Sequence, residues 1–257
     1  ISNPLGEDYS IMRTQPLNAM LTALSFNYSH KNENVWLYDM SNIYIPKELP
    51  LTELPDEREQ LTLGAYGDGV DFFSMKGVIE DIFDHLGMRE HYELKTDVNR
   101  PYFHPGRRAD VIYCGMTVGY IGEIHPFTAS NYGFKDGARV YIAVLDIPSI
   151  LDFVTFDRKH EGVTRFPAVS RDISMLVPKA TPAGDIENMI RRMGGSLLES
   201  TELFDIYEGE QVSEGYKSMA YSLSFRAKDH TLTDDEIVSA MNKVLEGLSS
   251  MNIELRS

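Results

Sequence analysis

The chain has 257 residues, enough for two domains with separate cores, and its 42% hydrophobic and 25% charged content is that of an ordinary globular protein. A net charge of −15 excludes a general nucleic-acid coat, because affinity for phosphate depends on clustered Lys and Arg. The longest apolar run, 140–145, is far shorter than the about 20 residues of a membrane-spanning helix, so we expect no membrane span.

Charge and cysteine content add three expectations. Residues 1–163 carry 14 basic and 24 acidic residues, and residues 164–257 carry 10 and 15, so a few focused cations in the second part remain compatible with RNA contact. The start lacks Met and any signal-peptide pattern, which indicates an excised piece of a longer chain. The single cysteine, Cys114, excludes an internal disulfide, fits a reducing cytoplasmic compartment and is expected to be a small buried strand residue.

The first part predicts two amphipathic helices among strands. Thr14-Gln-Pro16 indicates a helix start, and the apolar residues after it recur at helical spacing. The second helix has an apolar stripe and stops at Gly87. In order, we expect a helix from Thr14, strand structure at 35–45, a Pro- and Glu-rich loop at 45–55, a strand at 61–66, a helix at 70–86, and strands near Tyr92 and at 109–114, 117–124 and 139–145. The acidic run 53–59 is interpreted as a solvated loop, with contact to a basic patch of a partner as the alternative. This order favours an α+β domain with a largely antiparallel sheet.

The second part predicts a βαββαβ module. Residues 157–162 form a polar linker. Thr233-Asp-Asp-Glu236 is a capping box that opens the last helix. The expected elements are strands at 172–177, 197–207, 216–227 and 252–256, with helices at 182–193 and 234–248. This order is typical of ferredoxin-like domains.

The strand at 216–227 alternates between two kinds of side chain. One face carries Met219, Tyr221, Leu223 and Phe225, and the other carries small polar residues and ends in Arg226. We therefore expect one sheet face to pack on the two helices and the other to be available to a partner.

Several short sequence motifs together indicate a family resemblance. They share one order along almost the whole chain, which makes the set specific although each motif alone is weak. The motifs are Asn3-Pro-Leu-x-Glu-Asp-Tyr-Ser-x-Met-Arg-Thr14, Phe73-x-x-Lys-Gly-x-x-Glu80, His104-Pro-Gly-Arg107, Gly119-x-x-Gly-Glu-x-His-Pro126, Phe166-Pro-Ala-Val-Ser-Arg-Asp172, Leu203-Phe-Asp-x-Tyr207, Glu214-Gly-x-Lys-Ser218 and Phe225-Arg-Ala-Lys-Asp-His-Thr-Leu-Thr-Asp-Asp-Glu236. The chain resembles the C-terminal part of the beta subunit of bacterial phenylalanyl-tRNA synthetase.

The resemblance implies a degenerate class II synthetase-like domain over 1–155, a linker at 156–163 and a ferredoxin-fold anticodon-binding domain over 164–257. It also implies a part of phenylalanine–tRNA ligase that is itself inactive and that supports assembly with the catalytic alpha subunit in an alpha2-beta2 heterotetramer. This region would bind the anticodon region of tRNA(Phe), while the whole enzyme uses ATP and Mg²⁺. The implied location is the cytoplasm.

The residues agree that the first part lacks catalytic groups. Formation of an aminoacyl-adenylate requires phosphate charge to be neutralised, which active class II sites do with an Arg on a central strand, an Arg on a terminal helix, and metal. The corresponding strand, Trp36-Leu-Tyr-Asp-Met40, has an acid and no Arg. We therefore predict no catalytic residue and no metal site in this chain.

Two other patterns have alternative interpretations. His104, Glu123 and His125 could form a metal or acid–base group, but their spacing favours turn residues whose imidazoles bond to backbone. Gly67 and Gly69 could hold phosphate, but no Gly-Lys-Ser/Thr follows, so a plain turn is favoured.

The candidates for tRNA contact lie in the second part. Arg171, Arg226, Lys228 and Lys217 are expected phosphate ligands, and Phe166 is a candidate for base stacking. Arg165, Arg191 and Arg192 are second choices. The competing interpretation pairs Arg171 with Asp172 and Arg226 with Asp229, with the lysines solvated and Phe166 packed on its domain.

Other functions stay open at this level. Another RNA-binding protein could share βαββαβ order, although RNA-recognition motifs place aromatics outward on a Lys/Arg-Gly-Phe-type strand, which 216–222 lacks. A stand-alone enzyme or a ligand-binding regulator built on a degenerate synthetase domain is the third class.

Overall fold

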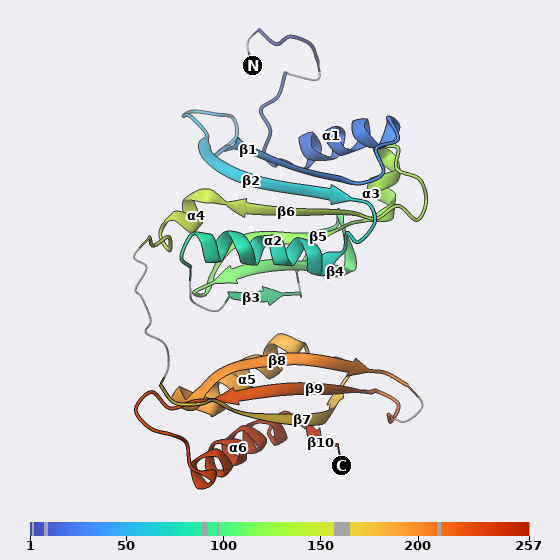
Figure 1. Cartoon of the computed structure of the whole chain (residues 1–257). Coiled ribbons are helices and arrows are strands. Elements are labelled where there is room, and N and C mark those ends of the chain that lie inside the picture. Colours follow the sequence, from blue (N-terminus) through green and yellow to red (C-terminus); the bar gives the residue numbers. More distant parts are fainter. Residues whose placement is uncertain are drawn as a thin grey trace. The chain divides into compact units, whose positions relative to one another are not determined.

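The computed structural model describes residues 1, 3–7, 10–88, 92–96, 98–156, 165–209 and 212–256. Chain contacts divide it into two compact units, Ile1–Lys159 and His160–Ser257, here called the first and second units. Figure 1 shows a sheet with helices in each unit. Most of the expected linker, from residue 157, lies outside the described residues. Among the described helices none is both long and apolar enough to cross a membrane.

The first unit is built on a six-stranded sheet of order β1-β2-β6-β5-β4-β3, in which every neighbouring pair is antiparallel. The strands are β1 (Val35–Ile45), β2 (Asp56–Tyr66), β3 (Tyr92–Lys95), β4 (Phe103–Tyr113), β5 (Met116–Ile124) and β6 (Val140–Asp146). Both faces of β6 are buried, in keeping with its continuous apolar run. The expected antiparallel α+β architecture is confirmed.

Helices cover both faces of this sheet. The helices are α1 (Leu17–Ser29), α2 (Phe72–His85), α3 (Pro126–Asn131) and α4 (Ile147–Leu151). Apolar side chains of α2 and α4 share a core with one sheet face, and those of α1 and α3 share a core with the other. The two longer helices were predicted from their apolar spacing, whereas α3 and α4 are too short to show a period.

The ends of α2 follow from local chemistry. Asp71 caps the first turn: its carboxylate accepts the Ser74 amide at 2.7 Å, and the Asp71 amide donates to the Ser74 hydroxyl at 2.8 Å. Gly87 has a φ of +70°, and a Cβ there would lie 2.0 Å from the Thr155 carbonyl oxygen. Glycine is therefore required at this helix stop, as expected from the sequence.

Two expectations for the first unit were wrong. The acidic run 53–59 was expected to be a solvated loop, but β2 already begins at Asp56, opposite Ile45 of β1. Strand pairing overrides the low strand propensity of these acids, which stay exposed. Cys114 is exposed, because it occupies a tight hairpin turn with a φ of +48° before Gly115 at +79°.

The second unit is a βαββαβ fold with sheet order β10-β7-β9-β8 and antiparallel pairing throughout. Its elements are β7 (Val169–Pro178), α5 (Ala183–Gly194), the short 3-10 helix Gly195–Leu197, β8 (Leu198–Tyr207), β9 (Tyr216–Phe225), α6 (Asp234–Ser249) and β10 (Glu254–Leu255). The predicted ferredoxin-like order is confirmed.

The central strand β9 divides the second unit into a packed face and an open one. Met219, Tyr221, Leu223 and Phe225 have no exposed surface and share a core with α5 and α6. The capping box at the start of α6 is present as predicted: Thr233 Oγ accepts the Glu236 amide, and Glu236 accepts the Thr233 amide at 2.9 Å. Both helices pack on the same sheet face, so the opposite face, here called the open face, has no helix of this unit over it.

Candidate functional site

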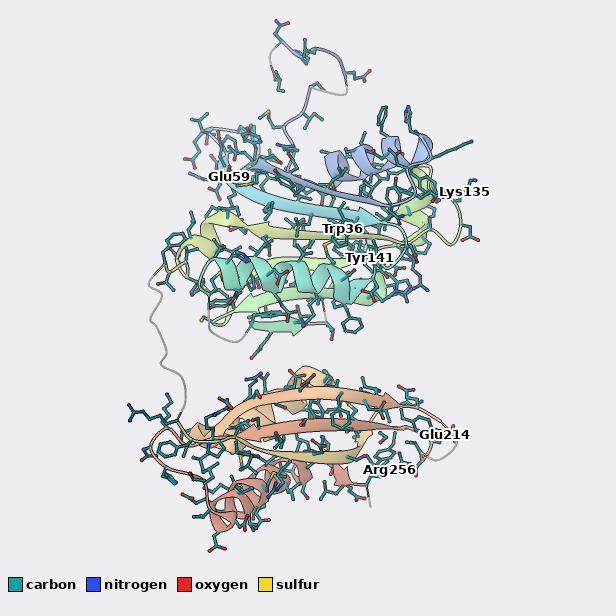
Figure 2. All side chains as sticks on the ribbon, in the orientation of Figure 1. Trp36, Glu59, Lys135, Tyr141, Glu214 and Arg256 are labelled. Atoms are coloured by element: carbon teal, nitrogen blue, oxygen red, sulfur yellow. The ribbon has the colours of Figure 1, made fainter. Side chains whose placement is uncertain are left out.

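A buried ion pair lies between β4 and β5 of the first unit. Glu123 is 3% exposed, and its two carboxylate oxygens accept Arg107 N–H groups at 2.6 and 2.8 Å. Tyr141, labelled in Figure 2, donates its hydroxyl to Glu123 at 2.6 Å. Burial alone would raise the pKa of Glu123, but the bonds from Arg107 and Tyr141 hold it below its ordinary value. A carboxylate kept ionised and fully bonded is suited to structure rather than proton transfer.

A second charged cluster fills the opposite face of the same strands. Arg100 donates to Asp110 at 2.7 Å and to the Tyr102 hydroxyl at 3.1 Å. Its guanidinium carbon lies 3.9 Å from the centre of the Tyr120 ring. Burial raises the pKa of the Tyr120 hydroxyl above its ordinary value. Arg100 is thus engaged in contacts within the first unit.

His104 and His125 bond to backbone, as favoured from the sequence. His104 Nδ1 accepts the Gly106 amide at 3.1 Å, and His125 Nδ1 accepts the Phe127 amide at 3.2 Å, which caps α3. The turn expected at His104 is instead a bulged part of β4. Within the described ranges, no three His, Cys, Asp or Glu residues come together as a metal site.

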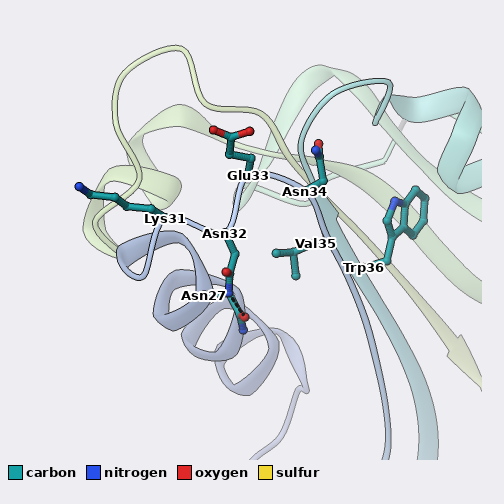
Figure 3. Close-up of a pocket in the computed structure, with 7 residues that line it drawn as sticks. All are labelled: Asn27, Lys31, Asn32, Glu33, Asn34, Val35 and Trp36. Atoms are coloured by element: carbon teal, nitrogen blue, oxygen red, sulfur yellow. Dashed lines mark hydrogen bonds between the residues drawn. The ribbon is translucent and has the colours of Figure 1, made fainter.

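The glycine pair after β2 forms a plain turn. Gly67 has a φ of +128°, and a Cβ there would lie 2.3 Å from Asn34 Oδ1. Figure 3 shows the adjacent hollow of about 580 Å³, which is lined by Asn27, Lys31, Asn32, Glu33, Asn34, Val35 and Trp36. Its amides bond to one another and to backbone: Asn32 Nδ2 donates to Asn27 Oδ1 at 2.8 Å, and Asn34 Oδ1 accepts the Asp68 amide at 2.6 Å. These groups stabilise the corner and do not form a phosphate cradle.

Three large side chains on the edge strand β1 are exposed. Trp36, Tyr38 and Met40 are 46%, 76% and 52% exposed, and they alternate along the strand on one face. Their pairing partners in β2 belong to the core under α2, so this row continues the apolar sheet face beyond the helix that covers its centre. Exposed aromatic rows of this kind mark protein contact surfaces. We call it the β1 row.

The open face of the second unit is polar, and most of its charges are acidic. Strand pairing places Ser218, Ala220, Ser222 and Ser224 of β9 on it. Strand register places four acidic residues on this face: Asp172, Glu202, Asp205 and Glu254. Hydrogen bonds place three more charged residues at or beside it: Glu199, Arg226 and Arg256. Such a face favours recognition of base edges over general attraction to phosphate.

One end of the open face combines an aromatic ring with hydrogen-bonding groups. Tyr207 of β8 is 41% exposed and lies opposite Ser218 of β9. Arg256, labelled in Figure 2, reaches across from the last strand and donates to the Ser218 hydroxyl at 3.3 Å. Asp205, two residues before Tyr207, pairs with Ala220 on the same face. A ring for stacking beside a guanidinium, a hydroxyl and a carboxylate is the combination that reads an unpaired base.

This tyrosine–serine–arginine group was missed in the sequence prediction. Tyr207 and Ser218 were quoted only as parts of the family motifs. The alternation of the β9 strand placed Ser218 on the polar face, but nothing local in the sequence brings Arg256 to it across β7.

The opposite end of β9 holds two predicted candidates. Arg226 donates to Glu199 at 2.8 Å and to the Phe166 carbonyl at 2.6 Å. The alternative that paired Arg226 with Asp229 is wrong, because Asp229 instead bonds to His230 at 2.7 Å. The Phe166 ring is half-buried. Arg226 and Phe166 are thus brought together, and Arg226 ties the start of the domain to its central strand.

The remaining candidates are spread over the domain. Arg171 is exposed and donates to the Ser170 carbonyl at 3.0 Å, but it pairs with Leu223 and therefore lies on the helix side of the sheet. Lys217 donates to the Thr181 carbonyl at 2.9 Å, nine residues from Arg226 along β9, or about 30 Å at strand spacing. Lys228 is exposed, and no bond to another described residue is recorded for it.

The second-choice cations are also exposed. Arg165 precedes Phe166, and Arg191 and Arg192 lie in the last turn of α5. Their side chains are exposed to solvent, and none of the three lies on a strand of the open face.

Comparison with known proteins gives two family matches. Residues 1–147 match the phenylalanyl tRNA synthetase beta chain CLM domain, and residues 164–256 match the ferredoxin-fold anticodon binding domain. The phenylalanine–tRNA ligase beta subunit of Clostridium acetobutylicum is 42% identical, and that of Clostridium tetani is 40% identical, both over the whole of this chain. The chain covers 32% of the length of each of these relatives.

One solved structure is only slightly similar. The pyrrolysyl tRNA synthetase of Desulfitobacterium hafniense aligns with 54% of this chain and 48% of its own, at 13% identity and a TM-score of 0.41. That likeness is too small to support any further conclusion.

Proposed function

Because the chain belongs to the phenylalanyl tRNA synthetase beta chain family, we propose that it is the non-catalytic C-terminal region of a phenylalanine–tRNA ligase beta subunit. Its second unit binds the anticodon region of tRNA(Phe), and its first unit supports assembly with a catalytic alpha subunit in an alpha2-beta2 enzyme of the cytoplasm. The proposed domains are 1–155 and 164–257, with a linker at 156–163.

The observation that carries the RNA-binding proposal is the group formed by Tyr207, Ser218 and Arg256. The ring of Tyr207 stacks on an unpaired anticodon base, and the Arg256 guanidinium, which bonds to the buried Ser218 hydroxyl, contacts the base edge. Asp205 accepts from a base amino or imino group. This arrangement differs from an RNA-recognition motif, whose central-strand aromatics face outward, because Tyr221 of β9 is fully buried.

The predicted cations differ in how free they are to contact RNA phosphate. Lys228 and Arg171 are exposed and serve as direct contacts, whereas Lys217 and Arg226 already bond within the domain and mainly hold its shape. Phe166 stacks on a base only if its half-buried ring turns outward, so we place it second to Tyr207. A few such contacts set the register of the RNA and leave base recognition to the open face.

The residues of the first unit do not fit an adenylate site. Its strand β1 offers Asp39 where phosphate binding needs a cation, and Asp39 accepts a bond from Ser41 at 2.7 Å. Arg100 and Arg107 are both engaged with carboxylates. We therefore assign ATP and Mg²⁺ to the catalytic partner, and assign the exposed β1 row to the contact with that partner.

The test removes the second unit from the full enzyme. Deletion of residues 164–257 should weaken tRNA(Phe) binding while sparing phenylalanine-dependent pyrophosphate exchange, because activation needs no RNA. Loss of the exchange reaction in a properly assembled enzyme would contradict the assignment. Exchange activity of this chain alone with ATP and phenylalanine would identify it instead as a stand-alone enzyme.

A further inference from the structure

His230 lies between two carboxylates at the junction of a loop and a helix. Its Nδ1 is 2.7 Å from Asp229 Oδ1, and its Nε2 is 2.9 Å from Glu236 Oε1. Asp229 belongs to the loop 226–233 after β9, and Glu236 belongs to the first turn of α6. The imidazole therefore bridges the loop and the helix.

The geometry selects the protonated form of His230. A neutral imidazole has one N–H and can satisfy only one of two carboxylates, whereas an imidazolium donates to both. The charged residues of the loop and of the first turn of the helix are mostly acidic: Arg226, Lys228, Asp229, Asp234, Asp235 and Glu236. The bond to Asp229, followed by that to Glu236, raises the pKa of His230 above its ordinary value. Because that pKa is raised, the bridge is complete at acidic pH and is lost as the pH rises through the folded value.

Glu236 also closes the helix cap. Its Oε2 accepts the Thr233 amide at 2.9 Å and the Thr233 hydroxyl at 2.8 Å. These bonds, with that from His230, lower the pKa of Glu236 to about 2, so this carboxylate stays charged at any pH where the protein functions. One carboxylate thus fixes both the end of the loop, through Thr233, and its middle, through His230.

We propose that protonated His230 is a positioning residue that clamps the loop 226–233 onto α6 and so fixes Lys228 for contact with RNA phosphate. The inference rests on the proposed tRNA binding of the second unit. Lys228 lies two residues before His230 and directly follows Ala227, which is buried in the core. The loop is therefore anchored at Ala227 on one side and by the clamp on the other, with the exposed lysine between them.

The consequence is a pH dependence of RNA affinity. Below the folded pKa of His230 the clamp is formed and the loop presents Lys228 in one arrangement. Above it the neutral ring releases one carboxylate, and the loop samples other conformations. The effect is modest because these groups are exposed, and a loss of about two- to fivefold in affinity is expected between pH 5.5 and 8.5.

The experiment uses the complete beta subunit in its complex with the alpha subunit and measures tRNA(Phe) binding at constant ionic strength from pH 5.5 to 8.5. His230→Gln should bind with the weaker affinity at every pH and flatten the profile. His230→Arg keeps a permanent charge between the two carboxylates and should hold the tighter affinity at pH 8.5. His30→Gln, which changes an exposed histidine of the first unit, should leave the profile as in the unaltered enzyme.

Separate outcomes test the clamp and the tRNA function. An NMR titration of His230 in this chain should give a pKa above 6.5, and a value at or below 6.5 overturns the clamp whatever the RNA results. A raised pKa together with identical binding profiles for His230→Gln and the unaltered enzyme overturns the link between clamp and affinity. Failure of Tyr207→Ala to affect tRNA binding contradicts the proposed function while leaving the NMR result intact.

Discussion

The two units use their charged and aromatic residues in opposite ways. In the first unit, Arg100 and Arg107 are drawn into the sheet and neutralised by Asp110 and Glu123. In the second unit, the open face leaves Tyr207 partly exposed opposite Ser218, the residue to which Arg256 donates. The first arrangement stabilises a domain, and the second leaves hydrogen-bonding groups for a ligand.

The difference supports the proposal that the first unit is a non-catalytic, synthetase-like domain. In the first unit, Arg100 and Arg107 each bond to a carboxylate of the same sheet. The exposed β1 row is largely apolar, which supports the proposal that it contacts a protein partner. The proposed RNA contact belongs to the second unit, whose open face is polar along β9.

The largest expected effect concerns the ion pair of Arg107 and the buried Glu123 in the first unit. Arg107→Leu leaves the buried Glu123 without its counter-ion and should destabilise the first unit by about 2 kcal/mol, below the range for fully buried pairs because the Arg107 side chain is 38% exposed. Urea unfolding of the 257-residue chain, followed by a first-unit probe such as Trp36 fluorescence, measures this.

The matched control is Arg58→Leu, which breaks the exposed pair of Arg58 and Asp56. It should change stability by about 0.5 kcal/mol or less. Equal losses of stability in the two variants would mean that the ion pair of the buried Glu123 contributes no more than the exposed pair of Arg58 and Asp56.

The next prediction separates the role of the open face of the second unit from that of the β1 row. Tyr207→Ala should weaken tRNA(Phe) binding by about 1–3 kcal/mol, the usual value of one base stacked on an aromatic ring, and leave co-purification with the alpha subunit unchanged. Tyr38→Ala should do the reverse, because that side chain is 76% exposed in the β1 row. Filter binding and affinity co-purification read the two outcomes. If both variants reduced only assembly, the separation of roles would be refuted.

A smaller effect concerns a phosphate contact. Lys228→Ala should weaken binding of all tRNA sequences alike and reduce the slope of log K against log salt by about 1. Lys47→Ala, which removes a cation paired with Glu53 in the first unit, should leave that slope unchanged. A sequence-selective loss in the Lys228 variant would assign the lysine to base recognition instead.

Much of the fold could be predicted because its signals are local. The Thr233 capping box, the alternation of β9 and the apolar stripe of α2 each determine an element from a few neighbouring residues. The prediction failed where strand pairing determines the ends of an element. Strand β2 begins among acidic residues because β1 supplies hydrogen-bonding partners for them. Cys114 is exposed because it lies in the two-residue turn between β4 and β5.

The candidate site was less predictable than the fold. Sequence analysis favoured cations, yet Arg226 turned out to bond to Glu199, 27 positions earlier in the chain. The group of Tyr207, Ser218 and Arg256 depends on the order in which four strands lie side by side. No local pattern carries that order, so the face proposed to recognise a base could be identified only from the assembled sheet.

The most direct test of the central claim is ultraviolet cross-linking of the complete enzyme to tRNA(Phe) carrying photoreactive anticodon bases, with the attached peptides identified by mass spectrometry. Attachment to Tyr207 and its neighbours on β8 and β9, lost in Tyr207→Ala, is the predicted result. Attachment confined to the helix side of the second unit, or to residues of the first unit, would contradict it.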